Sequence, residues 1–231
     1  MTDTVNPQQN TTFASNGHEA YGYLALPPAG AGPGLIVIQE WWGLTAHVAD
    51  LTDRFAAEGF VALAPDLYGG PTTHDPAEAG KMMAALPAAR AARDLAGAVD
   101  FLLAREDVTG SAVGVVGFCM GGGFTLALAA QQGARVAAAV AFYGWTEIED
   151  LSHLSAAVQG HIGENDAFIP AAVFREFATR VAAETGNAPD FHYYPAGHAF
   201  LNNENRLGTY DAEQAALAWQ RTVAFLHEHL G

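Results

Sequence analysis

Apolar residues fall into two kinds of segment that alternate along the chain. Short apolar runs such as Leu35–Gln39 and Phe60–Ala64 are typical of buried strands, whereas Thr45–Glu58 repeats its apolar residues at helical spacing. Strands that alternate with helices predict an α/β fold, with a mainly parallel sheet and helices on both faces. The other predicted strands are Glu19–Leu26, Ala112–Phe118, Ala137–Phe142, Ala157–Gly163 and Asp190–Tyr194. The other predicted helices are Ala88–Ala104, Met120–Gln131, Ala171–Glu184 and Asp211–Leu230.

Length and composition fit one folded domain. The chain has 231 residues, of which 50% are apolar and 15% are charged, so global disorder is excluded. No linker, repeat or low-complexity tract divides it. We therefore predict a single domain over residues 1–231, with the polar residues 1–10 as a flexible tail.

Charge and cysteine content exclude several classes of partner. Asp and Glu number 25 against 10 Lys and Arg, and the formal charge of −15 disfavours nucleic acid and anionic lipid. The uncharged run 112–132 is long enough to cross a bilayer, but its five glycines indicate a strand, a tight turn and a helix. The N-terminus lacks the features of a signal peptide. A single cysteine excludes an intrachain disulfide and a multi-cysteine metal cluster.

The strand Ala112–Phe118 leads into the sequence Gly117-Phe-Cys119-Met-Gly121, just before a predicted helix. This is the context of a nucleophile elbow, with cysteine in the serine position. The sharp turn strains the nucleophile's backbone, the glycines avoid neighbouring backbone, and the helix N-terminus favours a thiolate. The alternative is a buried structural cysteine beside a glycine-rich turn. The context favours a nucleophile.

A nucleophile elbow requires an acid and a histidine later in the chain, in that order. Asp166 follows the strand Ala157–Gly163, and His198 follows the last predicted strand. Glu164 is the alternative acid and His192 the alternative base. Position after the strand ends favours Asp166 and His198.

The loop after the strand Leu35–Gln39 reads Glu40-Trp41-Trp42. Loops at this place in the fold supply an N–H group to an oxyanion hole. The two tryptophans suggest that Glu40 has an apolar setting, where burial would raise the pKa of its carboxyl group. Without the other motifs, an ordinary loop acid beside two core aromatics would be the better interpretation.

Together these motifs resemble the dienelactone hydrolase family of α/β hydrolases, over about residues 20–230. The similar segments are LIVIQEWWGL, GFVALAPDLYGG, VGVVGFCMGGG, GENDAFIP and YYPAGHAF. The resemblance implies an α/β-hydrolase fold and the hydrolysis of an ester or lactone.

The resemblance also implies a role for each matching residue. Cys119 would be the nucleophile, His198 the general base and later acid, and Asp166 the residue that orients the imidazole. Glu40 would accept the proton of the thiol. The backbone N–H groups of the oxyanion hole would come from Trp41 and Met120. Tyr143 matches a family position near the site. Apart from the resemblance, Trp42, Phe118, Phe168 and Arg206 are also expected near the substrate.

The chain departs from the family where the substrate carboxylate is bound. The best-known members use two arginines, and the corresponding positions here hold Asn202 and approximately Pro76. Arg206 or Lys81 could replace them. The sequence therefore leaves the substrate open.

The resulting prediction is a cysteine-dependent hydrolase of an ester or lactone that works through a thioester and needs no metal or organic cofactor. One alternative is a broad carboxylesterase or thioesterase for neutral apolar esters, with Trp41, Trp42, Phe118 and Phe168 forming its pocket. Another is a non-catalytic binding protein with the same fold. The expected partner is a small ester or lactone, with no nucleic acid or membrane. The family suggests a monomer or homodimer in the cytoplasm.

Overall fold

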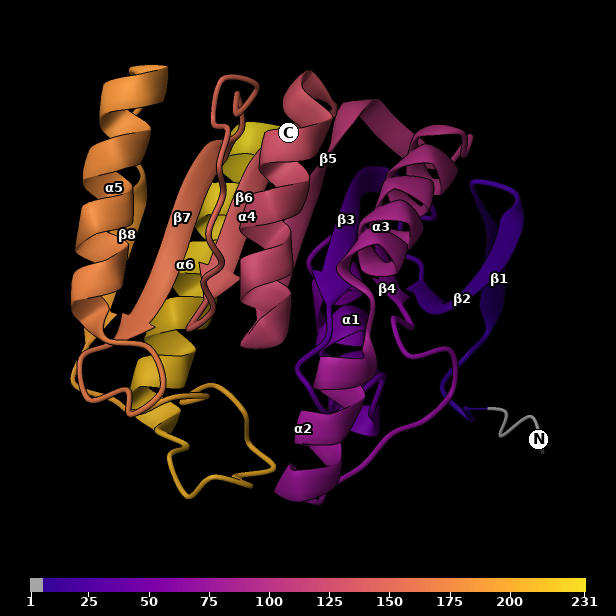
Figure 1. The fold of residues 1–231 in the computed structure, drawn as a ribbon. Helices are drawn as coiled ribbons and strands as arrows, with labels where there is room; N and C mark the ends of the chain where they lie inside the picture. Colours follow the sequence, from indigo (N-terminus) through magenta and orange to yellow (C-terminus); the bar gives the residue numbers. More distant parts are fainter. Residues whose placement is uncertain (1–5) are drawn as a thin grey trace. The chain divides into compact units, whose positions relative to one another are not determined.

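The computed structural model describes residues 6–231 and has the α/β fold that the sequence predicts (Figure 1). The chain divides into two compact units, residues 1–113 and 114–231. The boundary falls inside strand β5 (Val108–Phe118). The single domain over residues 1–231 stays a prediction.

The first unit contains four neighbouring strands in the order β1-β2-β4-β3. Strands β1 (Thr11–Ser15) and β2 (His18–Ala25) form a hairpin, and β2 also pairs antiparallel with β4 (Val61–Pro65). Strand β3 (Gly32–Ile38) runs parallel to β4. All five residues of β4 are buried, as expected for a strand covered on both faces.

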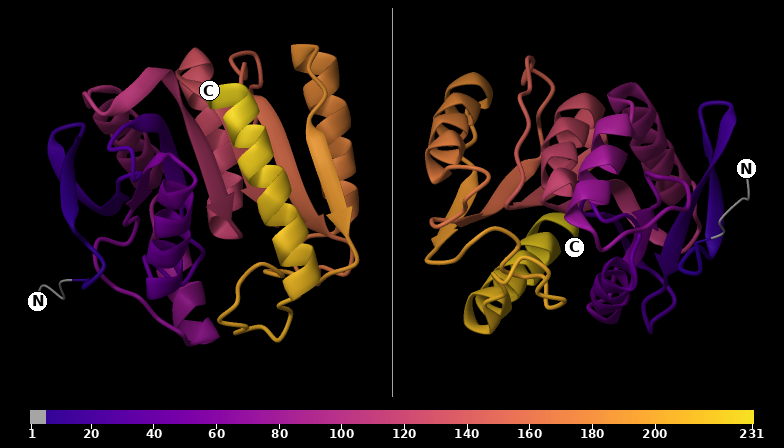
Figure 2. Two further views of the ribbon diagram at one scale, coloured as in Figure 1. Left: turned by 180° about the vertical axis from the view of Figure 1, so that it is seen from behind. Right: turned by 60° about the horizontal axis from the view of Figure 1, so that its bottom comes forward.

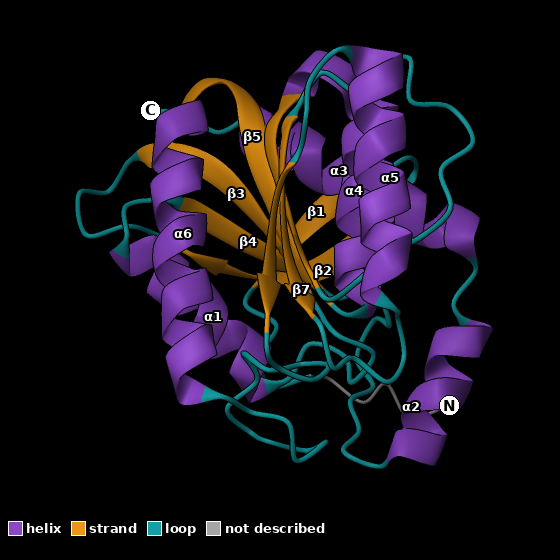
Figure 3. Cartoon of the chain, turned by 90° about the vertical axis from the view of Figure 1, so that its left-hand side faces the viewer, coloured by secondary structure: helices purple, strands orange, loops and turns teal. Residues whose placement is uncertain are grey.

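Helices cover both faces of the strands in the first unit. Helix α1 (Ala46–Ala57) lies on one face and α3 (Ala88–Leu103) on the other (Figure 3). The shorter helix α2 (Pro76–Ala85) is mostly exposed and buries only Ala79. Its first turn is fixed by Asp75, whose side chain accepts a hydrogen bond from the backbone N–H of Glu78.

In the second unit the strand order is β5-β6-β7-β8. Strands β6 (Val136–Phe142), β7 (Ala157–Gly163) and β8 (Asp190–Tyr194) run parallel. Their carboxyl ends therefore share one edge, and the loops that leave this edge carry the predicted acid and histidine.

Helices also cover both faces of the strands in the second unit. Helices α4 (Met120–Gln132) and α5 (Ala171–Thr185) lie on one face, and α6 (Ala212–Leu230) lies on the other (Figure 2). A short 3-10 helix, Gly133–Arg135, follows α4. No helix among residues 6–231 combines the length and the apolar character needed to cross a membrane.

All predicted strands and helices are present, mostly with small shifts at their ends. The largest shift concerns β5, which begins at Val108 and not at Ala112. Strand β1 and helix α2 were not predicted. In β1 only Phe13 and Ser15 are buried, and α2 has almost no buried face, so neither element leaves a strong apolar pattern.

The prediction of a flexible tail over residues 1–10 is wrong for its second half, while residues 1–5 lie outside the described residues. Asn6 is buried, and its side-chain amide donates to the carbonyl of Leu44 and to the carboxylate of Asp66. Gln9 donates to the same carboxylate at 2.8 Å. These polar side chains satisfy a buried acid, which is why a polar segment is held against the first unit.

Candidate active site

The turn between β5 and α4 places Cys119 in a strained backbone conformation, with φ 54° and ψ −116°. The backbone N–H of Cys119 donates to the carbonyl of Phe142 at 3.0 Å. The carbonyl of Cys119 accepts from the N–H of Gly122 at 2.9 Å. A positive φ is rare for a residue with a side chain and is maintained only where the surroundings fix it. The geometry agrees with the predicted elbow.

Close backbone packing explains the glycines around this turn. A Cβ atom on Gly117 would collide with the carbonyl of Gly121 and with the hydroxyl of Thr125. A Cβ atom on Gly144, in the loop after β6, would collide with the carbonyl of Cys119. The turn therefore depends on glycines from two different segments of the second unit.

The structure brings Cys119, His198 and Asp166 together. Nε2 of His198 lies 3.1 Å from Sγ of Cys119, and Nδ1 lies 2.7 Å from Oδ2 of Asp166. Both distances permit hydrogen bonds. The imidazole thus bridges the thiol and the carboxylate, in the order that a catalytic triad requires.

Hydrogen bonds join the loop after β7, which carries Asp166, to the loop after β8, which carries His198. The backbone N–H of Glu164 donates to the carbonyl of Tyr194, and that of Asn165 donates to the carbonyl of Ala196. The other carboxylate oxygen of Asp166 accepts from the backbone N–H groups of Phe168 and Ile169. The acid is therefore fixed by its own loop as well as by the imidazole.

Burial and hydrogen bonding act in opposite directions on the imidazole. Burial lowers the pKa of His198, but the hydrogen bonds and charges of Asp166 and Cys119 outweigh it and raise that pKa to about 10. For Asp166, burial raises the pKa, and the bond to His198 together with the N–H groups of Ile169 and Phe168 brings it below its usual value. Both shifts favour a charged imidazolium–carboxylate pair.

Glu164 and His192, the alternative acid and base, make contacts with other residues. Glu164 is half-exposed and forms an ion pair with Arg175 at 3.4 Å. His192 lies 3.0 Å from a carboxylate oxygen of Asp190, and its ring stacks on that of His161. The geometry thus favours Asp166 and His198 over both.

Two aromatic rings lie beside the imidazole of His198. The ring of Phe168 lies 4.9 Å from it and is 60% exposed, and the buried ring of Tyr143 lies 5.3 Å from it. Phe118, which the sequence assigns to the substrate pocket, is fully buried against Phe142. Phe168 is therefore the aromatic side chain of this group that solvent and ligands can reach.

The loop after His198 contains the candidate replacements for the family arginines. Arg206 lies 3.4 Å from Glu204 in an ion pair. Asn202 is buried, and its side-chain oxygen accepts from the backbone N–H of Glu204. The charge of Arg206 is thus partly neutralised within its own loop.

Glu40, Trp41 and Trp42 belong to the first unit, whereas Met120 belongs to the second unit as the first residue of α4. Glu40 and Trp42 are each 3% exposed, and Trp41 packs edge-to-face on Trp42. The hydroxyl of Tyr68 donates to the carbonyl of Trp41 at 3.1 Å. The sequence analysis missed Tyr68, although it lies in the similar segment GFVALAPDLYGG.

Thr209 is a second residue that the sequence analysis missed. Its hydroxyl donates to the backbone carbonyl of His198. No sequence motif marks this contact, because a threonine in a loop has many ordinary roles. Among residues 6–231, no group of three or more His, Cys, Asp or Glu side chains could hold a metal ion.

Comparisons with known proteins point to one family. The family model described as "Dienelactone hydrolase family" matches residues 20–230. "Protein usf" of Aquifex pyrophilus is 37% identical over 96% of this chain and 99% of its own length. A protein of Aquifex aeolicus named "Putative carboxymethylenebutenolidase" is 31% identical, with the same coverage. The crystal structure of a "Putative Dienelactone Hydrolase" from Klebsiella pneumoniae superimposes with a TM-score of 0.83 at 31% identity, covering 94% of this chain and 97% of that one.

Proposed function

The chain belongs to the dienelactone hydrolase family and is a hydrolase of esters or lactones, and we propose that Cys119 is its nucleophile. The observation that carries this proposal is the position of the His198 imidazole, 3.1 Å from Sγ of Cys119 and 2.7 Å from Asp166. These are the contacts that activate a nucleophile and orient its base.

In the acylation step, the thiolate of Cys119 attacks the carbonyl carbon of the substrate. The tetrahedral intermediate collapses, the bond to the leaving oxygen breaks, and that oxygen takes a proton from Nε2 of His198. The product that remains on the enzyme is a thioester, and the imidazole is left neutral. The raised pKa of His198 supports this step, because it favours an imidazolium beside the thiolate.

In the deacylation step, His198 changes from acid to base. Acylation removes the charge of Cys119 and its hydrogen bond to Nε2, which are two of the causes that raise the pKa of His198. The imidazole can then accept a proton from water, whose oxygen attacks the thioester. The acid product leaves, and the proton on Nε2 again pairs with the released thiolate.

The family resemblance supplies the other proposed roles. Glu40 is assigned to take the proton of the resting Cys119 thiol before attack and to return it to the thiolate after deacylation, and the backbone N–H groups of Trp41 and Met120 are assigned to the oxyanion hole. Met120 is the first residue of α4, where N–H groups point away from the helix body. Each oxyanion donor typically contributes about 10²–10³ in rate.

The preferred substrate is proposed to be a neutral ester or lactone. Phe168 offers an accessible apolar ring beside His198, while Arg206 is paired with Glu204 and Asn202 occupies one family arginine position. A buried substrate carboxylate without a matched cation costs several kcal/mol, roughly, to desolvate. The same features support a broad carboxylesterase as the second candidate.

Trapping the acyl-enzyme tests the proposal directly. The protein is mixed with p-nitrophenyl acetate, quenched in acid within the first turnover and analysed by mass spectrometry. We expect one acetyl group per chain, located on Cys119, and a matching burst of p-nitrophenol. The Cys119→Ala variant is the control and should show neither. Full activity in that variant, or an acetyl group on another residue, would contradict the proposal.

A further inference from the structure

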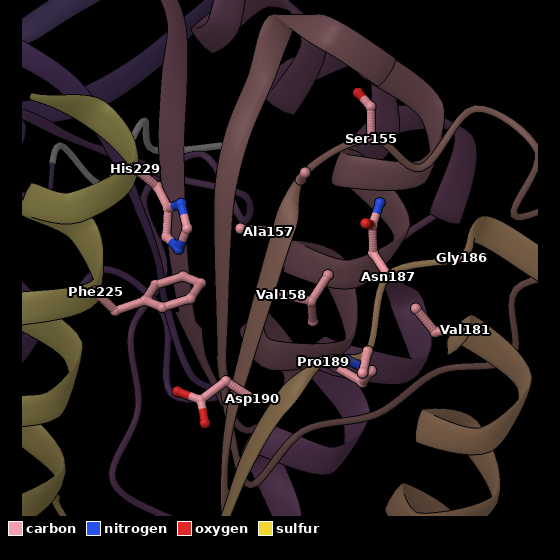
Figure 4. A pocket seen from close by; sticks show the side chains of 12 residues that line it. Ser155, Ala157, Val158, Val181, Gly186, Asn187, Pro189, Asp190, Phe225 and His229 are labelled. Carbon is pink, nitrogen blue, oxygen red and sulfur yellow. The ribbon is translucent and has the colours of Figure 1, made fainter.

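A cavity of about 410 Å³ lies in the second unit, at the amino ends of β7 and β8. The proposed catalytic groups follow the carboxyl ends of the same parallel strands, so the cavity is separate from them. Its wall combines the strand starts, the turn after α5 and the last turns of α6 (Figure 4). The residues used below are Val158, Val181, Asn187, Asp190, Phe225 and His229.

Several polar groups in the cavity wall have no hydrogen-bond partner among the described residues. Oδ2 of Asp190 accepts from the side-chain amide of Gln159 at 2.8 Å and lies 3.0 Å from Nε2 of His192. Over residues 6–231, the structure gives no hydrogen-bond partner to Oδ1 of Asp190, to the side-chain amide of Asn187 or to the ring nitrogens of His229. These groups can therefore bind a polar ligand.

The electrostatics of the cavity favour a cation. Asp190 is the only Asp, Glu, Lys or Arg among the lining residues. Helix α5 ends at Thr185, next to the cavity, and α6 contributes its last turns, so both present the negative end of a helix dipole. The ring of Phe225 lies between His229 and Asp190 in Figure 4 and can attract a cation to its face. The formal charge of −15 on the whole chain also favours a cationic ligand.

We propose that this cavity binds a small organic cation, namely a protonated amine with a compact apolar body. The ammonium group would donate to Oδ1 of Asp190, on the side of the cavity where the ring of Phe225 lies. The apolar body would lie against Val158, Val181 and Phe225, which line the same cavity. A volume of about 410 Å³ is within the range of small-molecule sites and accommodates a single ring.

Three probes of similar size and different charge test the proposal by isothermal titration calorimetry. Benzylamine is the cation, benzyl alcohol the neutral analogue and benzoate the anion. We expect benzylamine to bind at least about 10-fold more tightly than either analogue, because it alone forms a charge-assisted bond with Asp190. Equal affinity for benzyl alcohol would overturn the proposal.

Two cavity variants and one control variant locate the binding site. Asp190→Asn preserves shape and removes the charge, and should weaken benzylamine binding by about 10-fold or more. Glu176→Gln removes one charge from an exposed position of α5 outside the cavity and should leave binding unchanged. If Asp190→Asn does not fold, Asn187→Trp, at an exposed turn position, should abolish binding by filling the cavity. Unchanged binding in a folded cavity variant would overturn the proposal.

Alkylation of Cys119 separates this cavity from the catalytic site. Benzylamine should bind the alkylated protein with the same affinity as the untreated protein, since the cavity lies at the other end of the strands. Loss of binding on alkylation would assign the amine to the catalytic site and would also overturn the proposal. Neither result depends on the enzyme's substrate.

Discussion

The hydroxyl of Thr209 donates a hydrogen bond of 2.5 Å to the backbone carbonyl of His198. The next residue, Ala199, has a φ of 59°, so the chain turns sharply as soon as it leaves the histidine. The backbone N–H of Asp211 donates to the carbonyl of Phe200 and closes the same loop. The position of the His198 imidazole thus depends on the hydrogen bond from Thr209 to its backbone as well as on the contacts of the ring with Cys119 and Asp166.

We expect Thr209→Val to reduce kcat about 10-fold, because the carbonyl of His198 loses its donor and the imidazole is held less firmly. The stability of the fold should fall by about 1–3 kcal/mol, the cost of a buried acceptor without a partner. Steady-state kinetics and urea denaturation measure the two effects. Thr209→Ser, which retains the hydroxyl, should restore kcat; failure of this rescue would show that the hydrogen bond is unimportant.

The second prediction concerns stability and compares alanine substitutions at two glycines, Gly144 and Gly80. Gly144→Ala places a methyl group against the carbonyl of Cys119, so the backbone must shift, and we expect a loss of about 2 kcal/mol or more together with most activity. Gly80→Ala is the matched control. It lies inside α2, and the nearest atom to its added Cβ is 4.0 Å away, on Trp41. That variant should gain about 0.5–1 kcal/mol from helix propensity. Similar melting temperatures for the two variants would contradict the packing argument.

The charge state of His198 gives a third prediction. Its folded pKa, about 10, exceeds the ordinary value of 6.5, so protonation of His198 stabilises the fold. This contribution is complete below about pH 6.5 and is lost as the pH rises through 10. In Cys119→Ala the hydrogen bond and charge of the thiolate are absent, while burial still opposes protonation, so the pKa of His198 should fall.

Titration of the His198 ring by NMR, in wild type and in Cys119→Ala, measures this difference. The Cys119→Ala variant should also lose less stability than wild type between pH 7 and pH 9.5. An unchanged imidazole pKa in the variant would show that Asp166 alone determines it.

Much of the fold follows from local patterns in the sequence. Strands β7 and β8 begin and end at the predicted residues, and Pro189 and Pro195 bound β8 on either side. Cys119, Asp166 and His198 are selected by their order along the chain and their places after strand ends, and their side chains lie within hydrogen-bonding distance in the second unit. Their catalytic roles remain proposals.

What the sequence could not supply were contacts between distant residues. Asn6 is polar and near the chain end, yet it is buried because it satisfies Asp66 and Leu44. The contact of Thr209 with His198 joins two loop positions that carry no periodic pattern. Such contacts depend on tertiary packing, which hydrophobic periodicity does not encode.

Substrate charge gives the last prediction, because Arg206 is paired with Glu204 in this structure. We expect a neutral lactone or methyl ester to be hydrolysed with a kcat/KM about 10- to 100-fold higher than that of its carboxylate analogue, since one charge-assisted contact is missing. Glu204→Gln removes the partner of Arg206 and should narrow this ratio, while Arg206→Ala should leave the neutral substrate almost unaffected. A wild-type preference for the carboxylate that disappears in Arg206→Ala would contradict the prediction. It would show that Arg206 leaves Glu204 and binds the substrate anion in place of the family arginines.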